Sequence, residues 1–130
     1  MTGDNMISPG MVQERRKDPR LENNIPVKIS QEGGDIVTET KNISRSGAYC
    51  CVNQYIEPMT KLMVHLLLSF SKAGKTVTKK ISCEGVIVRT EPAADDGKYH
   101  IAIFFSDIKK RDAESVTDYV DTYLSKKETV

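Results

Sequence analysis

The feature that most constrains the fold of this chain is the strict alternation of residues between Leu62 and Phe70. In an extended chain every second side chain points to the same face, whereas a helix would spread these positions around its axis. One face of the stretch is wholly apolar and consists of Leu62, Val64, Leu66, Leu68 and Phe70. Met63, His65 and Leu67 form the other face, which we expect to be partly covered. The stretch predicts a strand that lines a hydrophobic core.

Five further stretches have the length and residue pattern of β-strands. They lie at residues 25–30, 36–44, 47–53, about 76–90 and 99–105. Short segments rich in Gly, Asp and Ser separate several of them, which favours antiparallel hairpins. Gly85 interrupts the alternation of the longest stretch, so we expect a β-bulge or a close approach of two backbones there.

The periodicity changes after Asp107, which we take as the N-cap of a helix. Apolar residues then recur at three- and four-residue intervals, at Val116, Tyr119, Val120, Tyr123 and Leu124. This spacing predicts an amphipathic helix over about 107–125, which we expect against the sheet face that carries Met63 and Leu67. The fold class is therefore mainly β: a small six-stranded antiparallel β-barrel with a C-terminal α-helix.

The length of 130 residues suits one domain with an appreciable core. We expect a flexible tail over residues 1–13 and a single domain over residues 14–126 that includes the helix. The net charge of +1 gives no reason to expect binding to a nucleic acid polymer. Tryptophan is absent and aromatic residues make up only 6% of the chain, which argues against a stacking platform for single strands.

The chain has no stretch that suits membrane insertion or secretion. The longest apolar run, Leu62 to Leu68, is interrupted by His65 and is too short to span a bilayer. Residues 1–13 contain no apolar run of the length that a signal peptide needs. The three cysteines, two of them adjacent, do not form the even set of a disulfide framework. We expect a cytoplasmic protein.

No set of residues in the sequence has the pattern of a catalytic or metal centre. A nucleophile with a base and an orienting group is not recognisable, and no Cys/His spacing is that of a zinc site. His65 and His100 lie in predicted strands, where structural roles are more common than catalytic ones. The sequence thus predicts a protein that is not an enzyme and that has neither a metal nor a cofactor.

Four cations crowd into the segment Glu14 to Arg20, which we call the basic strap. Asp18 precedes a proline, and this disfavours a continuous helix through the segment. Arg16 and Arg20 are four residues apart, which is about 13 Å in an extended chain. Guanidinium groups bind phosphate in a bidentate manner and can donate twice to the O6/N7 edge of guanine. The strap therefore suits a phosphate-containing ligand.

A second cluster, the polar shelf, consists of Asn42, Ser44 and Gly47. In a strand Asn42 and Ser44 project from the same face, while Ile43 points the other way into the core. The amide can donate and accept, and the hydroxyl can do either. The shelf is suited to reading the edge of a heterocyclic base or to holding a phosphate.

The order of the two motifs, Arg-x-x-x-Arg followed by Asn-x-Ser-x-x-Gly, resembles the PilZ domain family. The resemblance covers about residues 14–107. Gly85-Val86-Ile87-Val88-Arg89 is similar to the Gly-x-Val-Val-Arg strand of the family, and residues 101–105 are similar to its closing Ile-Gly-x-x-Phe strand. Members of this family bind the bacterial second messenger cyclic di-GMP.

The resemblance implies a role for each motif residue. Arg16 and Arg20 would contact guanine and phosphate, and Asn42, Ser44 and Gly47 would hold a guanine edge and the adjacent phosphate. Arg15 stands directly before the first motif arginine, where an arginine in this family tends to accompany an intercalated cyclic di-GMP dimer.

Arg89 and Ala102 are two further candidates for the site. Arg89 either touches the ligand or pairs with a carboxylate. Ala102 stands where glycine is usual in the family, and its methyl group could lower affinity. Asn42 stands where many relatives have aspartate, and its amide offers guanine one acceptor oxygen where a carboxylate offers two.

The resemblance implies a cyclic di-GMP receptor or adaptor that orders the basic strap over the shelf and signals to an unidentified protein partner. The alternative is a degenerate family member that acts only as a protein-interaction module and binds no nucleotide. The C-terminal helix offers a face for a homodimer. The resemblance implies cyclic di-GMP as the ligand and implies no cofactor.

Overall fold

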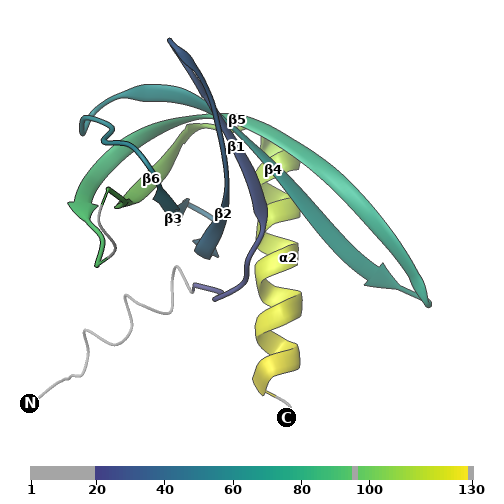
Figure 1. The fold of residues 1–130 in the computed structure, drawn as a ribbon. Coiled ribbons are helices and arrows are strands. Elements are labelled where there is room, and N and C mark those ends of the chain that lie inside the picture. The colour runs from purple at the N-terminus through teal and green to yellow at the C-terminus, as the bar shows by residue number, and fades with distance from the viewer. Residues whose placement is uncertain (1–19, 95–96, 129–130) are drawn as a thin grey trace, which may run out of the picture.

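The computed structural model of the protein describes residues 20–94 and 97–128. Within these ranges the chain forms six strands and one helix: β1 (Pro26–Gln31), β2 (Gly34–Ser44), β3 (Gly47–Val52), β4 (Lys61–Lys72), β5 (Lys75–Pro92), β6 (Tyr99–Asp107) and α2 (Lys110–Glu128). The strands are antiparallel to their neighbours and close into a barrel in the order β1-β2-β3-β6-β5-β4 (Figure 1). The predicted fold class is confirmed.

The apolar face of β4 lies in the core, as its alternation predicts. Val64, Leu66 and Leu68 are fully buried, and Leu62 and Phe70 are nearly so. The opposite face of the strand is partly covered, as expected, because Met63 and Leu67 are 41% and 42% exposed and His65 is half-buried, but α2 does not lie on it. The expectation that the C-terminal helix covers this outer face is therefore wrong.

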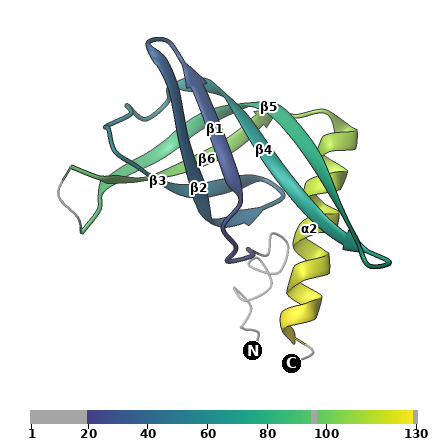
Figure 2. The ribbon, with the colours of Figure 1, turned by 45° about the vertical axis from the view of Figure 1, so that its right-hand side comes forward.

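Helix α2 packs against the other face of the β4–β5 hairpin, which extends beyond the rest of the barrel (Figure 2). Strand β1 pairs with β4 only as far as Leu66, and β6 pairs with β5 only from Glu84 onward. The end of the hairpin, residues 67–83, therefore has no further strand beside it. Its apolar face would be exposed to water if no other element covered it. The helix supplies the cover, and its residues Val116, Tyr119 and Val120 are buried.

Aromatic and polar contacts fix the position of α2. The ring of Tyr119 meets that of Phe70 edge to face, with the centroids 5.5 Å apart. The Tyr119 hydroxyl accepts a hydrogen bond from Nδ2 of Asn23 at 2.6 Å, and the Tyr123 hydroxyl donates to the carbonyl oxygen of Ser69 at 3.0 Å. The helix therefore bridges the hairpin and the segment that leads into β1.

The helix begins at Lys110, three residues later than the predicted N-cap at Asp107. Strand β6 continues through Asp107, which pairs with Glu84 of β5. Asp107 is thus the last residue of a strand, and the prediction that it caps the helix is wrong. No helix in the described ranges is long and apolar enough to cross a membrane.

Gly85 lies at a β-bulge, which is one of the two features that its position in the sequence predicts, and it is crowded by side chains rather than by another backbone. The pairing of β5 with β6 shifts register between Glu84 and Gly85, which is a bulge. A side chain at Gly85 would place its Cβ atom 2.7 Å from Cγ2 of Ile103 and 2.9 Å from Cγ2 of Val64. The glycine therefore permits the barrel wall to approach its own core closely.

Candidate functional site

The segment that follows the basic strap is attached to β2. The backbone N–H of Leu21 donates to the carbonyl oxygen of Ile43 at 2.8 Å, and the N–H of Ile43 donates to that of Leu21 at 2.9 Å. Leu21 is fully buried, so this attachment is part of the core. It fixes Arg20, the last residue of the strap, next to the end of β2.

Arg20 makes a direct contact with the polar shelf. Its Nη1 atom donates a hydrogen bond to Oδ1 of Asn42 at 3.0 Å, across 22 positions of sequence. The arginine side chain is exposed and Asn42 is half-buried. Two predicted site residues, one from each motif, are thus brought together. Arg15 and Arg16 lie outside the described residues.

A bulge in β2 sets the orientation of Asn42. The pairing with β3 shifts register between Thr40 and Asn42. Thr40 is fully buried, and its hydroxyl donates to the carbonyl oxygen of Asn23 at 2.6 Å and accepts from the N–H of Ile25 at 3.0 Å. These bonds hold the bulge and the incoming segment in a defined position, and with them the shelf.

Ser44 lies on the same side of β2 as Asn42 but is fully buried. Its Oγ atom is 3.3 Å from Oγ of Ser46 and accepts a hydrogen bond from the N–H of Ser46, also at 3.3 Å. The hydroxyl therefore shapes the turn between β2 and β3 in this structure. Gly47, which follows the turn, pairs with Ser44 and with Phe104.

Gly47 has no space for a side chain. A Cβ atom at this position would collide with the carbonyl oxygen of Ile103 on β6. The glycine of the shelf is thus required by the close packing of β3 against β6, and this requirement exists without any ligand.

The shelf continues as a row of side chains across the outer face of the barrel. Asn42 of β2 pairs with Tyr49 of β3, Tyr49 pairs with Ala102 of β6, and Ala102 pairs with Arg89 of β5. Ile43, Ala48 and Ile103, which alternate with members of this row, are buried in the core. Both additional candidates, Arg89 and Ala102, therefore share a face with Asn42.

Arg89 stands at the far end of the row, opposite Arg20. Its Nε atom is 3.9 Å from Oε2 of Glu91, and both side chains are more than half exposed. An exposed pair of this length contributes little to stability. The guanidinium is therefore held near the outer face by a contact that a stronger anion can replace.

Three ring-bearing residues that were not predicted as part of the site, Tyr49, His100 and Phe104, lie on this face. The rings of Tyr49 and His100 stack with their centroids 5.4 Å apart and an interplanar angle of 15°. Phe104 lies on the same strand as His100 and is 49% exposed. Their positions in the sequence could have indicated them, because residues two apart in a strand share a face. Tyr49 is two residues after Gly47, and His100 and Phe104 each lie two residues from Ala102.

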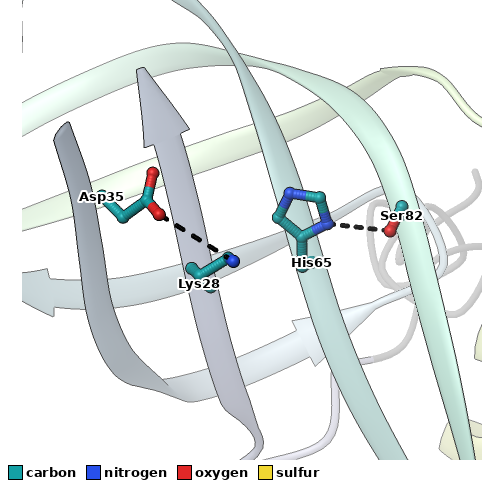
Figure 3. A network of polar contacts seen from close by, with 4 residues as sticks. All are labelled: Lys28, Asp35, His65 and Ser82. Atoms are coloured by element: carbon teal, nitrogen blue, oxygen red, sulfur yellow. Dashed lines mark hydrogen bonds and ion pairs between the residues drawn. The ribbon is translucent and has the colours of Figure 1, made fainter. Parts of the chain in front are cut away.

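Other polar groups of the barrel form separate cross-strand pairs. Nζ of Lys28 is 3.8 Å from Oδ2 of Asp35, and Nδ1 of His65 is 2.8 Å from Oγ of Ser82 (Figure 3). Each pair joins two neighbouring strands on the outside of the barrel. His65 is therefore part of a structural contact, as its place in a strand indicates.

A cavity among the described residues lies elsewhere, between the first half of β2 and the end of β3. It has a volume of about 680 Å³ and is bordered by residues such as Val37, Lys41, Asn53 and Lys98. None of the predicted site residues lines it. The candidate site is therefore a shallow outer face and not this cavity.

Two of the three cysteines, Cys50 and Cys83, are buried free thiols. Burial raises the pKa of the Cys50 thiol to about 12 and that of Cys83 to about 11. A thiol that stays protonated at neutral pH is a poor nucleophile and a poor metal ligand. No group of three or more metal-ligating side chains is found in the described part of the chain.

Comparison with known proteins adds a family and two solved folds. The model of the PilZ domain family matches residues 14–122. The structure of the Bacillus subtilis inhibitor of motility (MotI/DgrA) is similar, with a TM-score of 0.74 and 22% identity over 87% of this chain and 53% of that one. This chain thus spans about half the length of that protein.

A second similar structure is the PilZ domain of CeSA from a cellulose-synthesizing bacterium. Its TM-score is 0.50, and the identity is 17% over 80% of this chain and 96% of that one. At these identities the likeness establishes the fold. Among the curated proteins compared, none matches the sequence.

Proposed function

Because the chain belongs to the PilZ domain family, a family of cyclic di-GMP receptors, we propose that it binds cyclic di-GMP and transmits this binding to a protein partner. The observation that carries the proposal is the hydrogen bond of 3.0 Å between Arg20 and Asn42. It joins the end of the basic strap to the polar shelf, and these are the two motifs that resemble the ligand-binding motifs of the family. The protein acts as an adaptor and not as an enzyme.

The chemistry of the two residues suits a guanine nucleotide. Oδ1 of Asn42 accepts from Arg20 in the structure, and a guanine N–H group can take the place of this donor. The guanidinium of Arg20 is then free to bind a phosphate or the O6/N7 edge of guanine in a bidentate manner. Ligand binding therefore exchanges the hydrogen bond between Arg20 and Asn42 for one contact from each of these residues to the ligand.

The row across the barrel offers a second cation for a ligand with two phosphates. Arg89 is three strands away from Asn42, which corresponds to about 14 Å at the usual spacing of about 4.8 Å between strands. Arg16 of the strap belongs to the same site in this proposal. Arg15 sets the stoichiometry and favours two intercalated ligands per chain.

Ligand binding orders the strap, residues 14–20, over the shelf, and the ordered strap presents a new surface to the protein partner. Hydrogen exchange measured with and without cyclic di-GMP tests this step. We expect slower exchange in residues 14–20 when the ligand is bound. Equal exchange in both states, at a ligand concentration that saturates the protein, would contradict the ordering of the strap.

Isothermal titration calorimetry with cyclic di-GMP tests the site. The variant Arg20→Ala removes charge-assisted hydrogen bonds worth about 1.5–3 kcal/mol, so we expect about 10- to 150-fold weaker binding. Arg111→Ala is the matched control, because it removes the same charge from the exposed surface of α2. We expect the affinity of this control to equal that of the wild type.

The same titration separates the proposal from its alternative. Equal affinity of Arg20→Ala and the wild type would exclude Arg20 from the site. A wild-type protein that is folded but binds no cyclic di-GMP would instead be a module for protein interaction alone. A stoichiometry near two that falls to one in Arg15→Ala would support the role of Arg15.

A further inference from the structure

Four residues of β3 and β6 form a square on the outer face of the barrel, next to the polar shelf. Gly47 pairs with Phe104, and Tyr49 pairs with Ala102. The two small residues therefore lie on one diagonal of the square, and the two aromatic residues lie on the other. Gly47 and Ala102 form a flat floor, and Phe104 and Tyr49 stand on either side of it.

The separation of the two aromatic residues suits one planar ring. Diagonal neighbours in an antiparallel sheet lie about 7–8 Å apart. This is twice the optimal separation of about 3.5–4.0 Å between carbon atoms of stacked groups. A flat heterocycle that enters between Phe104 and Tyr49 can therefore contact both rings at once.

His100 shows which face of Tyr49 is available. The two rings are stacked, 5.4 Å between centroids and 15° from parallel, so His100 covers one face of the tyrosine. His100 and Phe104 lie on β6 on opposite sides of Ala102, the partner of Tyr49. The face of Tyr49 opposite His100 is thus the one toward Phe104, which is itself 49% exposed.

We propose that Phe104 and Tyr49 form a slot that holds one purine base of the ligand by stacking on both of its faces. The inference rests on the proposed function, because it assigns the base contacts of the same cyclic di-GMP site. Arg20 with Asn42 stands on one side of the slot and Arg89 on the other, so the phosphates have cations on both sides of the base. His100 is a positioning residue that keeps the ring of Tyr49 in place.

Titration of variants with cyclic di-GMP tests the slot. Stacking of a base on an aromatic side chain contributes about 1–3 kcal/mol by alanine substitution, so Tyr49→Leu and Phe104→Leu should each weaken binding about 5- to 150-fold. Tyr55→Leu is the matched control, because Tyr55 is about half exposed, like Phe104, and contacts Tyr99 outside the slot. Its affinity should equal that of the wild type.

Two further variants test the floor and the positioning residue. Ala102→Leu fills the slot and should weaken binding while Arg20, Asn42 and Arg89 remain. His100→Ala should weaken binding, and His100→Phe should restore it, because a second ring can stack on Tyr49 in place of the imidazole. A residue that only supports the fold would not be rescued in affinity by this exchange.

A spectroscopic measurement on the wild type tests the slot without any variant. A base stacked between the two rings shifts the ring-proton resonances of Tyr49 and Phe104 to higher field, and those of Tyr55 stay in place. Wild-type affinity in Tyr49→Leu and Phe104→Leu, with unshifted resonances, would overturn the slot but leave the proposed function intact. If the wild type binds no cyclic di-GMP at all, the proposed function fails and the slot fails with it.

Discussion

Replacement of Gly47 by alanine tests whether the glycine of the shelf serves the fold or the ligand. A Cβ atom at Gly47 would collide with the carbonyl oxygen of Ile103, which belongs to the backbone of β6 and cannot rotate away. The two strands must separate there, near the 2.9 Å hydrogen bond from the N–H of Phe105 to the carbonyl oxygen of Ser46. We therefore expect Gly47→Ala to destabilise the fold.

The magnitude follows from three contributions. Overpacking of a dense site costs about 1–3 kcal/mol, and a lost hydrogen bond costs about 0.5–1.5 kcal/mol. Alanine restricts the unfolded chain, which offsets about 0.4–1 kcal/mol. The net cost is about 0.5–4 kcal/mol, which corresponds to a decrease of about 2–16 °C in the midpoint of thermal unfolding.

Gly85→Ala is the matched control, because its Cβ atom would also meet Ile103. There the nearest atoms are the Cγ2 methyl groups of Ile103 and Val64, at 2.7 Å and 2.9 Å, which belong to stiff side chains but not to the backbone of the sheet. Urea unfolding should therefore show a smaller loss for Gly85→Ala than for Gly47→Ala. An unchanged unfolding free energy in Gly47→Ala, together with lost ligand binding, would refute the structural role and make Gly47 a ligand contact.

Two further predictions concern the barrel itself. Thr40→Val removes a buried hydroxyl that forms hydrogen bonds with Ile25 and Asn23, so urea unfolding should show a decrease of about 1–3 kcal/mol in the unfolding free energy. Thr76→Val, at an exposed position of β5, should change the unfolding free energy little. Equal effects of the two substitutions would contradict the role of Thr40. Burial raises the pKa of Cys50 from 9.0 to about 12, so its contribution to stability is complete below pH 9 and is lost as the pH rises toward 12. Between pH 8 and pH 10 this loss is about 1 kcal/mol. In Cys50→Ala the decrease in unfolding free energy between pH 8 and pH 10 should be smaller than in the wild type by this amount. An equal decrease in the variant and the wild type would contradict the prediction.

The strands could be predicted to within a few residues because their signal is local. Alternation reports which side chains of β4 share a face, and the structure buries that face. Alternation does not show where along a strand the pairing with its neighbours ends, and so it does not show which apolar side chains need cover from another element. The helix covers Phe70 and its surroundings because β1 and β6 end before that part of the hairpin, and this depends on pairings between distant strands.

The candidate site could be predicted only in part for the same reason. The motif residues Arg20 and Asn42 are 22 positions apart in sequence, and the structure joins them by a hydrogen bond. The burial of Ser44 depends on how the turn folds back on its hydroxyl. The arrangement of Tyr49, His100 and Phe104 depends on the register of β3 against β6, which no local pattern of residues reveals.

Calorimetric titration of the unsubstituted chain with cyclic di-GMP tests the central claim most directly. The contact between Arg20 and Asn42, within a chain that matches the PilZ domain family, predicts saturable binding of one or two ligands per chain at micromolar concentration or below. Circular dichroism of the same sample establishes that the protein is folded. The absence of any binding heat from a folded sample would contradict the account.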